Sequence, residues 1–377
     1  MKEVWRFIKK DAVLTAAWVL AAISVIFVHP DAGYVGYIDW RSLGILWSLM
    51  IIMQGFQDNR LFTRIGSLLL RKTGSIRQLT AVLVFLCFVS SMLITNDVAL
   101  ITFVPFAVLI LKQYGREDLL IPTLVLQTVA ANLGSMLTPV GNPQNLYLYG
   151  ISGMSIGEFM FHMLPCTVLA AVMLGISVLL LKTGKGSGKG MCLPDTEGSI
   201  PKLDKGRITV FLLLFLLALL TVLRLIPYYI LVLAVLVSVL VIERKTLKEV
   251  DYALLLTFVG FFIFTGNMAR ISAVRAALEA VVGGHELLAG VLASQCISNV
   301  PAALLLSGFT DEYPALLLGV NFGGLGTLIA SMASLISYKQ FARVCRGQTV
   351  KYLVCFTEVN VIFLAVLLAA QACWVHL

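Results

Sequence analysis

The chain has little charge for its length. Only 13% of its 377 residues are Asp, Glu, Lys or Arg and only four are His, whereas 59% are apolar. A soluble domain is typically about 25% charged and roughly 45–50% apolar. This shortage of charge excludes a soluble globular enzyme, a disordered chain and a nucleic-acid-binding protein. The length suits one polytopic helical membrane domain.

Motifs for catalysis, metal binding and ATP hydrolysis are missing. The seven cysteines form no C-x-x-C pair and most lie in apolar runs, so we predict neither a disulfide framework nor a resident metal site. The segment that begins at His285 imitates H-E-x-x-H, but Ala289 occupies the place of the second histidine. There is no Walker A loop and no G-x-S-x-G elbow. We therefore expect no enzyme activity and no cofactor.

Long apolar runs predict an all-α polytopic membrane protein with about nine full spans. Residues 79–111 and 285–310 are apolar but interrupted by polar pairs, which predicts two re-entrant hairpins. Residues 119–150 and 312–346 each carry a Gly-, Ser- and Thr-rich break, which predicts two broken helices. Such irregular backbone is tolerated at membrane depth only inside protein or beside a wet cavity. The continuous spans are predicted at 12–28, 43–56, 158–181, 207–225, 228–243, 251–267 and 352–374.

Basic residues are distributed unevenly between the loops. With the N-terminus inside and each hairpin returning to its own side, 24 of the 28 Lys and Arg residues fall in cytoplasmic segments. This bias predicts a cytoplasmic N-terminus and an outside C-terminus, in a plasma membrane of bacterial type. Residues 183–206 are rich in Gly and Pro and are predicted to be a cytoplasmic linker between the halves 1–182 and 207–377.

The two halves contain the same order of elements. Each has a span, an amphipathic segment, a hairpin, a broken helix and another span. Asn132 and Asn321 align at an offset of 189 residues, and the same offset pairs Thr138 with Thr327. Because the first spans of the halves run in opposite directions, the pattern predicts an inverted-topology repeat. Such repeats are typical of secondary transporters, which bind substrate and ions near the membrane midplane.

Three segments resemble the ion-transporter superfamily: TNDVAL at 95–100, NLGSMLTPVGNPQN at 132–145 and SNVPA at 298–302. That group includes citrate and dicarboxylate permeases, divalent-anion/sodium symporters, arsenite-pump membrane subunits and a sodium/proton antiporter branch. The resemblance implies a mobile transport domain formed by the hairpin tips and helix breaks, a scaffold that dimerises, and an elevator-type movement. The first tip is closer to the arsenite and antiporter branches, so substrate and coupling ion stay open.

The tips and breaks supply the candidate chemistry. The tip amides of Asn96 and Asn299 can offer oxygen to a cation and N–H to an anion, or they can cap the following helix. Asp97 would bind a cation or carry a proton, since a carboxylate at membrane depth is usually functional; a helix-capping role is the alternative. The breaks can expose carbonyls and helix ends to ions, or they can be structural kinks. The predicted substrate- and ion-binding residues are Thr95, Asn96, Asp97, Thr138, Pro139, Gly141, Asn142, Asn145, Ser298, Asn299, Thr327 and Ser331.

Together these patterns predict an ion-coupled secondary active transporter of a small anion, either citrate- or dicarboxylate-like or inorganic. No Arg or Lys lies at a tip or break, so amides, helix ends and a co-bound cation would meet the anion. Na+ or H+ is the expected coupling ion, with Na+ placed near Asn96 and Asp97. Arsenite efflux and sodium/proton antiport are the alternatives, and a channel or an intramembrane enzyme ranks below them. The expected partners are the anion, membrane lipid and a second copy of the chain, with no nucleic acid.

Overall fold

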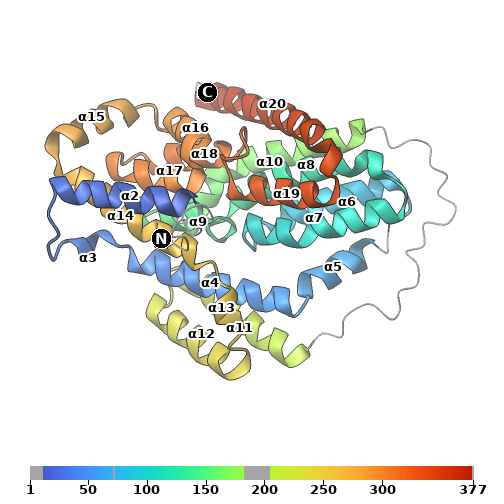
Figure 1. Ribbon diagram of the computed structural model, residues 1–377, viewed down its shortest axis with the longest axis horizontal. Coiled ribbons are helices and arrows are strands. Elements are labelled where there is room, and N and C mark those ends of the chain that lie inside the picture. The colour runs from blue at the N-terminus through green and yellow to red at the C-terminus, as the bar shows by residue number, and fades with distance from the viewer. Residues whose placement is uncertain (1–11, 71–72, 182–203, 376–377) are drawn as a thin grey trace. The chain divides into compact units, whose positions relative to one another are not determined.

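The computed structural model describes residues 12–70, 73–181 and 204–375 (Figure 1). Among these residues every regular element is an α-helix or a 3-10 helix, which confirms the predicted all-α class. The predicted linker at 183–206 lies almost entirely outside the described residues.

Six helices of the described part are long and apolar enough to cross a membrane, which supports a polytopic membrane protein. The bent pair Ser272–Val282 and Glu286–Ile297 would add a seventh. This number is lower than the nine predicted spans because nine includes the broken helices and shorter apolar helices such as α12 (Tyr228–Ile242). The number of full spans therefore stays a prediction.

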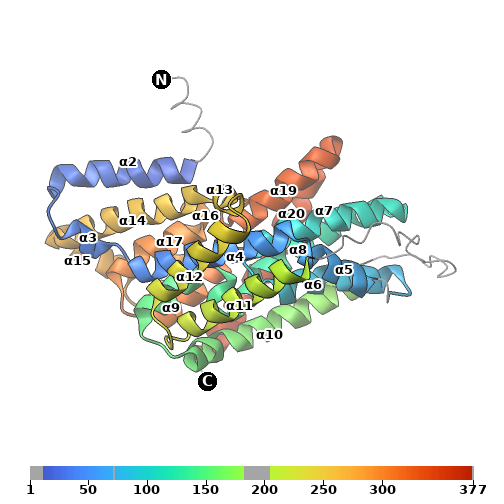
Figure 2. The ribbon, with the colours of Figure 1, turned by 90° about the horizontal axis from the view of Figure 1, so that it is seen from below.

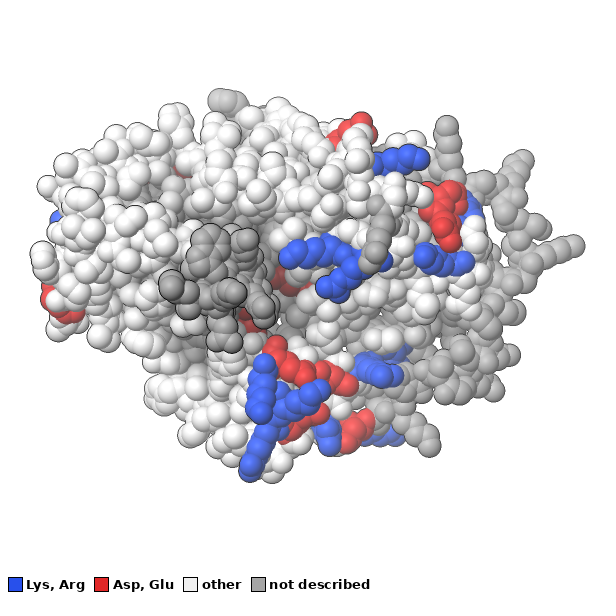
Figure 3. Space-filling view, in the orientation of Figure 1, with Lys and Arg blue, Asp and Glu red and all other residues white. Residues whose placement is uncertain are grey.

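The exposed surface has the apolar character that lipid contact requires. Large side chains on the outer face of α10 (Ile156–Leu180), including Phe161, Val168 and Leu179, are more than half exposed. In the face drawn in Figure 3, charged side chains gather in a few clusters and leave most of the surface uncharged.

The chain divides into two compact units that interleave the sequence halves. Unit 1 comprises Met1–Gln54, Pro143–Met154 and Leu213–Gly323, and unit 2 comprises Gly55–Asn142, Ser155–Leu212 and Gly324–Leu377. The boundaries after Asn142 and Gly323 cut both broken helices at their breaks. Each unit therefore contains one hairpin, the helix before its own break and the helix after the other break.

In unit 2 the first hairpin consists of α6 (Ile76–Ser90) and α7 (Asn96–Gln113). Ser75 caps α6 by accepting a hydrogen bond from the backbone N–H of Gln78. At 1.5 Å per residue α7 is about 27 Å long, close to a hydrocarbon core of roughly 30 Å, so its re-entrant character stays a prediction. The remaining main helices of this unit are α5 (Leu61–Leu70), α8 (Leu120–Gly134), α10, α19 (Met332–Val344) and α20 (Thr349–Val375).

In unit 1 the second hairpin consists of α16 (Glu286–Ile297) and α17 (Asn299–Leu306), and α16 packs against α18 (Tyr313–Phe322). A Cβ on Gly290 would lie 3.0 Å from the backbone carbonyl carbon of Gly319, so these two helices touch backbone to backbone. Figures 1 and 2 show α2 and α14 side by side. The other helices that lie wholly in unit 1 are α2 (Ala12–Phe27), α3 (Tyr34–Tyr37), α9 (Pro143–Ser152), α12, α13 (Thr246–Glu249), α14 (Tyr252–Arg270) and α15 (Ser272–Val282). Two helices, α4 (Trp40–Asp58) and α11 (Lys205–Val222), run across the unit boundary.

Candidate functional site

Asn132 is the centre of a buried polar cluster in unit 2. Its Oδ1 accepts hydrogen bonds from Asn96 Nδ2 and from Ser331 Oγ, each at 3.0 Å. Its Nδ2 donates to the backbone carbonyl of Gly324 at 3.3 Å and to Ser334 Oγ at 3.4 Å. The Asn132 side chain is only 3% exposed. The cluster thus joins the first hairpin tip, the first helix break and the second helix break.

The first hairpin tip holds three of the predicted residues. Thr95 precedes α7 with extended backbone, and its side chain makes no capping hydrogen bond. The Oδ1 of Asn96 accepts from the backbone N–H of Asp97 at 2.9 Å, while its Nδ2 reaches Asn132. The Asn96 oxygen thus bonds to the first turn of α7, as the helix-capping alternative expects, and binding of an ion by this side chain stays a prediction. Asp97 is half-buried in the first turn of α7, where the positive end of the helix dipole favours a negative charge.

Two predicted side chains in the first break bind to nearby protein groups. The Thr138 hydroxyl donates to the backbone carbonyl of Met92, in the turn of the first hairpin. The Nδ2 of Asn142 donates to Ser135 Oγ at 2.6 Å. The Thr138 contact holds the break against the hairpin, and the Asn142 contact lies within the break, between its two short 3-10 helices and α9.

The backbone of the breaks is compact. Pro139 and Gly141 belong to the short 3-10 helix η3 (Pro139–Gly141), and a Cβ on Gly141 would overlap the carbonyl oxygen of Ser135. In the second break, the Ser331 hydroxyl belongs to the Asn132 cluster, but the side chain of Thr327 is exposed. The alignment of Thr138 with Thr327 therefore does not extend to equal burial.

A second buried polar cluster lies in unit 1. The Nδ2 of Asn321 donates to Asn145 Oδ1 at 2.7 Å and to the backbone carbonyl of Leu317 at 2.8 Å. The Oδ1 of Asn321 is buried and has no hydrogen-bond partner among the described residues. The aligned pair Asn132 and Asn321 thus occupies a buried cluster in each unit, but only Asn132 has its amide oxygen satisfied.

The second hairpin meets its helix break through a residue that the sequence did not single out. Ser298 at the tip has a φ of 74°, in the left-handed region, and Asn299 begins α17 in a buried position. A hydrogen bond to the break comes from Gln295, whose Nε2 donates to the backbone carbonyl of Gly323 at 2.9 Å. A lone glutamine in the apolar α16 is the only sequence signal for this role.

The same close contact occurs in both units. A Cβ on Gly134 would lie 2.6 Å from Ser91 Oγ, and a Cβ on Gly323 would lie 2.5 Å from Ser294 Oγ. The two glycines are 189 residues apart, which is also the offset between Asn132 and Asn321. The two serines are 203 residues apart, the offset between the tip asparagines. Each hairpin therefore approaches its broken helix at an equivalent place.

A line of hydroxyl groups extends the unit 2 cluster by one helical turn. Thr128 Oγ1 donates to Ser337 Oγ at 2.8 Å, and Ser337 Oγ lies 3.1 Å from the Tyr352 hydroxyl. All three residues are buried. This line connects α8 and α19 to α20, and no local sequence pattern predicts it because Thr128 and Ser337 are 209 residues apart.

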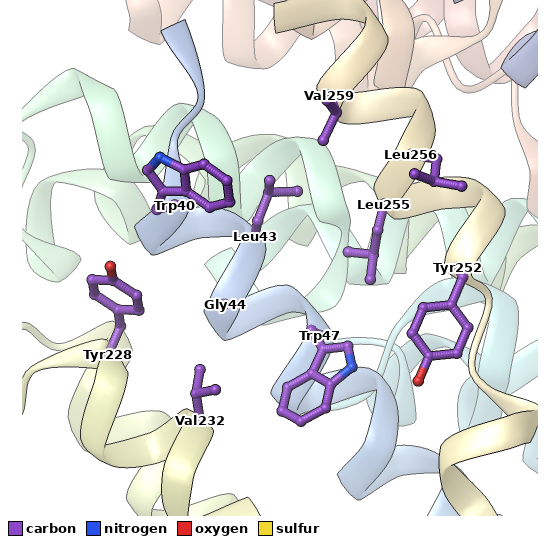
Figure 4. Close-up of a pocket in the computed structure, with 10 residues that line it drawn as sticks. All are labelled: Trp40, Leu43, Gly44, Trp47, Tyr228, Val232, Tyr252, Leu255, Leu256 and Val259. Carbon is purple, nitrogen blue, oxygen red and sulfur yellow. The ribbon is translucent and has the colours of Figure 1, made fainter. Parts of the chain in front are cut away.

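A groove of about 370 Å³ lies elsewhere in unit 1, between α4, α12 and α14 (Figure 4). Trp40 and Trp47 line it from α4, and Tyr228 and Tyr252 line it from the other two helices. The groove contains none of the predicted site residues and offers no charged or amide side chain to an ion.

Comparison with known proteins identifies relatives over most of the chain. Residues 4–322 match the model of a family described as citrate transporter. An uncharacterised transporter of Methanocaldococcus jannaschii is 33% identical over 308 residues, which cover 80% of this chain and 81% of that protein. The inner membrane protein YbiR of Escherichia coli is 31% identical over 329 residues, which cover 85% and 86% of the two chains.

A plant protein is similar over a shorter stretch. The silicon efflux transporter of rice is 29% identical over 202 residues, covering 52% of this chain and 41% of the rice protein. The family and the relatives that carry a functional name are transporters, not enzymes.

Proposed function

The chain belongs to the citrate transporter family, and we propose that it is an ion-coupled secondary active transporter of a small anion. The Asn132 cluster carries the proposal. In it, a hairpin tip and two helix breaks that are far apart in the sequence bring amide and hydroxyl groups together in a buried place. Buried polar groups in a membrane domain are costly, and they usually mark a substrate or ion pathway.

An inverted repeat with an elevator-type movement is part of the proposal. It is supported by the equivalent glycine–serine contacts at Gly134 and Gly323 and by the aligned asparagines in the two units. In such repeats, the ends of broken helices bind the substrate and the coupling ion. A second copy of the chain and surrounding lipid are the proposed partners of the scaffold.

The polar clusters favour a small anion that binds without a direct positive charge. No Lys or Arg stands at either tip or break, so the anion would bind to amide N–H groups, helix N-termini and a co-bound cation. Asp97 is the proposed ligand of that Na+ or the carrier of the coupled proton. Citrate and dicarboxylates are the first substrates to test.

Efflux of a small inorganic hydroxy acid, such as arsenous acid, is the second candidate. The observations that favour it are the uncharged amide and hydroxyl groups around Asn132 and Asn321 and the similarity to a protein named as a silicon efflux transporter. Sodium/proton antiport is the third, and it depends on Asp97.

The proposed location is a plasma membrane of bacterial type, with the N-terminus in the cytoplasm and the C-terminus outside. The distribution of Lys and Arg supports this orientation.

Transport by purified protein in liposomes tests the function. We expect labelled citrate or a dicarboxylate to exchange against unlabelled substrate, to saturate, and to accumulate only under an imposed Na+ or H+ gradient. A channel would pass the ion without saturation or exchange. Absence of exchange with every carboxylate, together with gradient-driven efflux of arsenous acid, would favour the second candidate.

A further inference from the structure

Gln144 is a fully buried glutamine whose amide has no protein partner. It is the second residue of α9 and is 0% exposed. Neither its Nε2 nor its Oε1 has a hydrogen-bond partner among the described residues. Burying an amide in this way costs free energy, and such groups in native proteins call for a specific explanation.

A second unsatisfied group belongs to Asn321, which bonds to the residue that follows Gln144 in α9. Asn145, the next residue after Gln144, accepts the hydrogen bond from Asn321, and the Oδ1 of Asn321 is itself buried without a partner. The two hydrogen bonds that Nδ2 of the same amide donates, at 2.7 and 2.8 Å, distinguish it from Oδ1, so Oδ1 is the atom without a partner. Three polar atoms are therefore unsatisfied on one residue of α9 and one of α18: two amide oxygens and one amide nitrogen.

The chemistry of these three atoms limits the ligand. A carboxylate only accepts hydrogen bonds, so it would leave both amide oxygens unsatisfied, and a metal ion would leave the amide nitrogen unsatisfied. A hydroxyl group both donates and accepts, so it can accept from Gln144 Nε2 and donate to one of the two amide oxygens, more than either of the other groups can do. We propose that Gln144 and Asn321 form a subsite that recognises a hydroxyl group of the transported ligand.

This inference rests on the proposed function, because it takes the ligand to be the transported substrate. Two kinds of small molecule carry the required hydroxyl: a hydroxycarboxylate such as citrate or malate, and an inorganic hydroxy acid such as arsenous or silicic acid. The carboxylates of the first kind would bind to N–H donors elsewhere in the site.

Ligand pairs that differ by one hydroxyl test the subsite. Citrate is compared with propane-1,2,3-tricarboxylate, and malate with succinate, by thermal stabilisation of the purified protein and by exchange in liposomes; arsenous and silicic acids form a separate arm. We expect the wild-type protein to prefer the hydroxylated member of a pair by about tenfold or more, because the analogue leaves buried amides unsatisfied.

Gln144→Leu removes the amide and keeps the bulk. We expect it to abolish the preference by weakening only the hydroxylated ligand, and to leave the unliganded protein at least as stable as wild type, since no protein hydrogen bond is lost. Gln127→Leu is the matched control: Gln127 is equally buried, but its Nε2 donates to the backbone carbonyls of Leu83 and Phe103. That variant should lose stability and keep the ligand preference.

Where a hydroxylated probe binds, three results would each overturn the subsite. They are a wild-type protein that binds both members of each pair equally, a Gln144→Leu variant that keeps the preference, and a Gln144→Leu variant that loses stability as Gln127→Leu does. If no carboxylate is transported but arsenous or silicic acid binds in a Gln144-dependent way, the anion proposal fails and the hydroxyl subsite stands. If no hydroxylated probe binds at all, the subsite is rejected.

Discussion

The hydrogen bond between Asn96 and Asn132 gives a quantitative prediction. Both side chains are buried, and the Nδ2 to Oδ1 distance is 3.0 Å. Interhelical hydrogen bonds in membrane proteins average about 0.6 kcal/mol in double-mutant cycles and reach about 1.7 kcal/mol. Both side chains are buried away from water, and the Asn132 oxygen accepts a second hydrogen bond from Ser331. We therefore expect a coupling energy between Asn96 and Asn132 of about 1–1.7 kcal/mol.

The assay measures reversible unfolding of Asn96→Ala, Asn132→Ala and the double variant. A denaturing detergent is titrated, and tryptophan fluorescence monitors the unfolding. Asn132→Ala alone should cost about 2–4 kcal/mol, because it removes four contacts and leaves Asn96 and Ser331 without their acceptor. The double variant should be less unstable than the sum of the single variants by the coupling energy.

A control cycle within unit 2 combines Asn132→Ala with Asn360→Ala. The Nδ2 of Asn360 donates to Phe356 in its own helix, and it shares no partner with Asn132, so the two effects should add to within about 0.3–0.5 kcal/mol. An Asn96–Asn132 coupling inside that same margin would show that the tip and the break are not energetically linked, and the argument from the cluster would fail.

Further predictions follow from the helix contacts, the acidic residue and the charge bias. Gly134→Ala should prevent correct folding, because its Cβ would overlap the Phe88 carbonyl oxygen, whereas Gly175→Ala, with its nearest atom at 4.0 Å, should be neutral or stabilising by up to about 1 kcal/mol; equal thermal stability of the two variants would contradict the close packing. Asp97→Asn should abolish gradient-driven uptake while lowering the free energy of unfolding by no more than about 1 kcal/mol, since only the interaction of its charge with the helix dipole is lost; wild-type uptake by this variant would leave Asp97 with that electrostatic role only. Single cysteines introduced at 183–206 should react with a membrane-impermeant maleimide only when the reagent can reach the cytoplasmic face of the membrane. Labelling from the outside would show that the predicted orientation is wrong.

The sequence predicted where the helices turn and break. Asn96 and Asn299 begin α7 and α17, and the first break ends where α9 begins at Pro143. These positions could be predicted because a polar pair, or a cluster of Gly and Pro, interrupts an apolar run that is otherwise unbroken. Local chemistry is sufficient to place such interruptions.

Partners across the fold could not be predicted from the sequence. Asn132 donates a hydrogen bond to Ser334, which lies 202 residues further along the chain. No local sequence pattern predicts a contact at that separation. Gln127 and Gln295 lie in mainly apolar helices, and Gln144 lies in the 132–145 motif, but nothing in the sequence distinguishes the hydrogen bonding of the three glutamines. Only tertiary packing shows which of them donates to a carbonyl and which has no protein partner.

In the proposed repeat, two clusters of similar geometry differ in which of their polar atoms have protein partners. At the offset of 189 residues, Asn145 corresponds to Ser334 and Gln144 corresponds to Ala333. In unit 2, Ser331 and Asn96 both donate to the Asn132 oxygen, so that cluster is complete by itself. In unit 1 the equivalent oxygen of Asn321 has no protein donor, and Gln144 adds two more unsatisfied atoms where the other half has only a methyl group. The unpaired atoms of the unit 1 cluster are available to a ligand directly, whereas the Asn132 oxygen would have to exchange a protein donor to bind one. Substitutions at equivalent positions of the proposed repeat, here Gln144 for Ala333, are therefore enough to give one cluster unpaired amide atoms that the other cluster lacks.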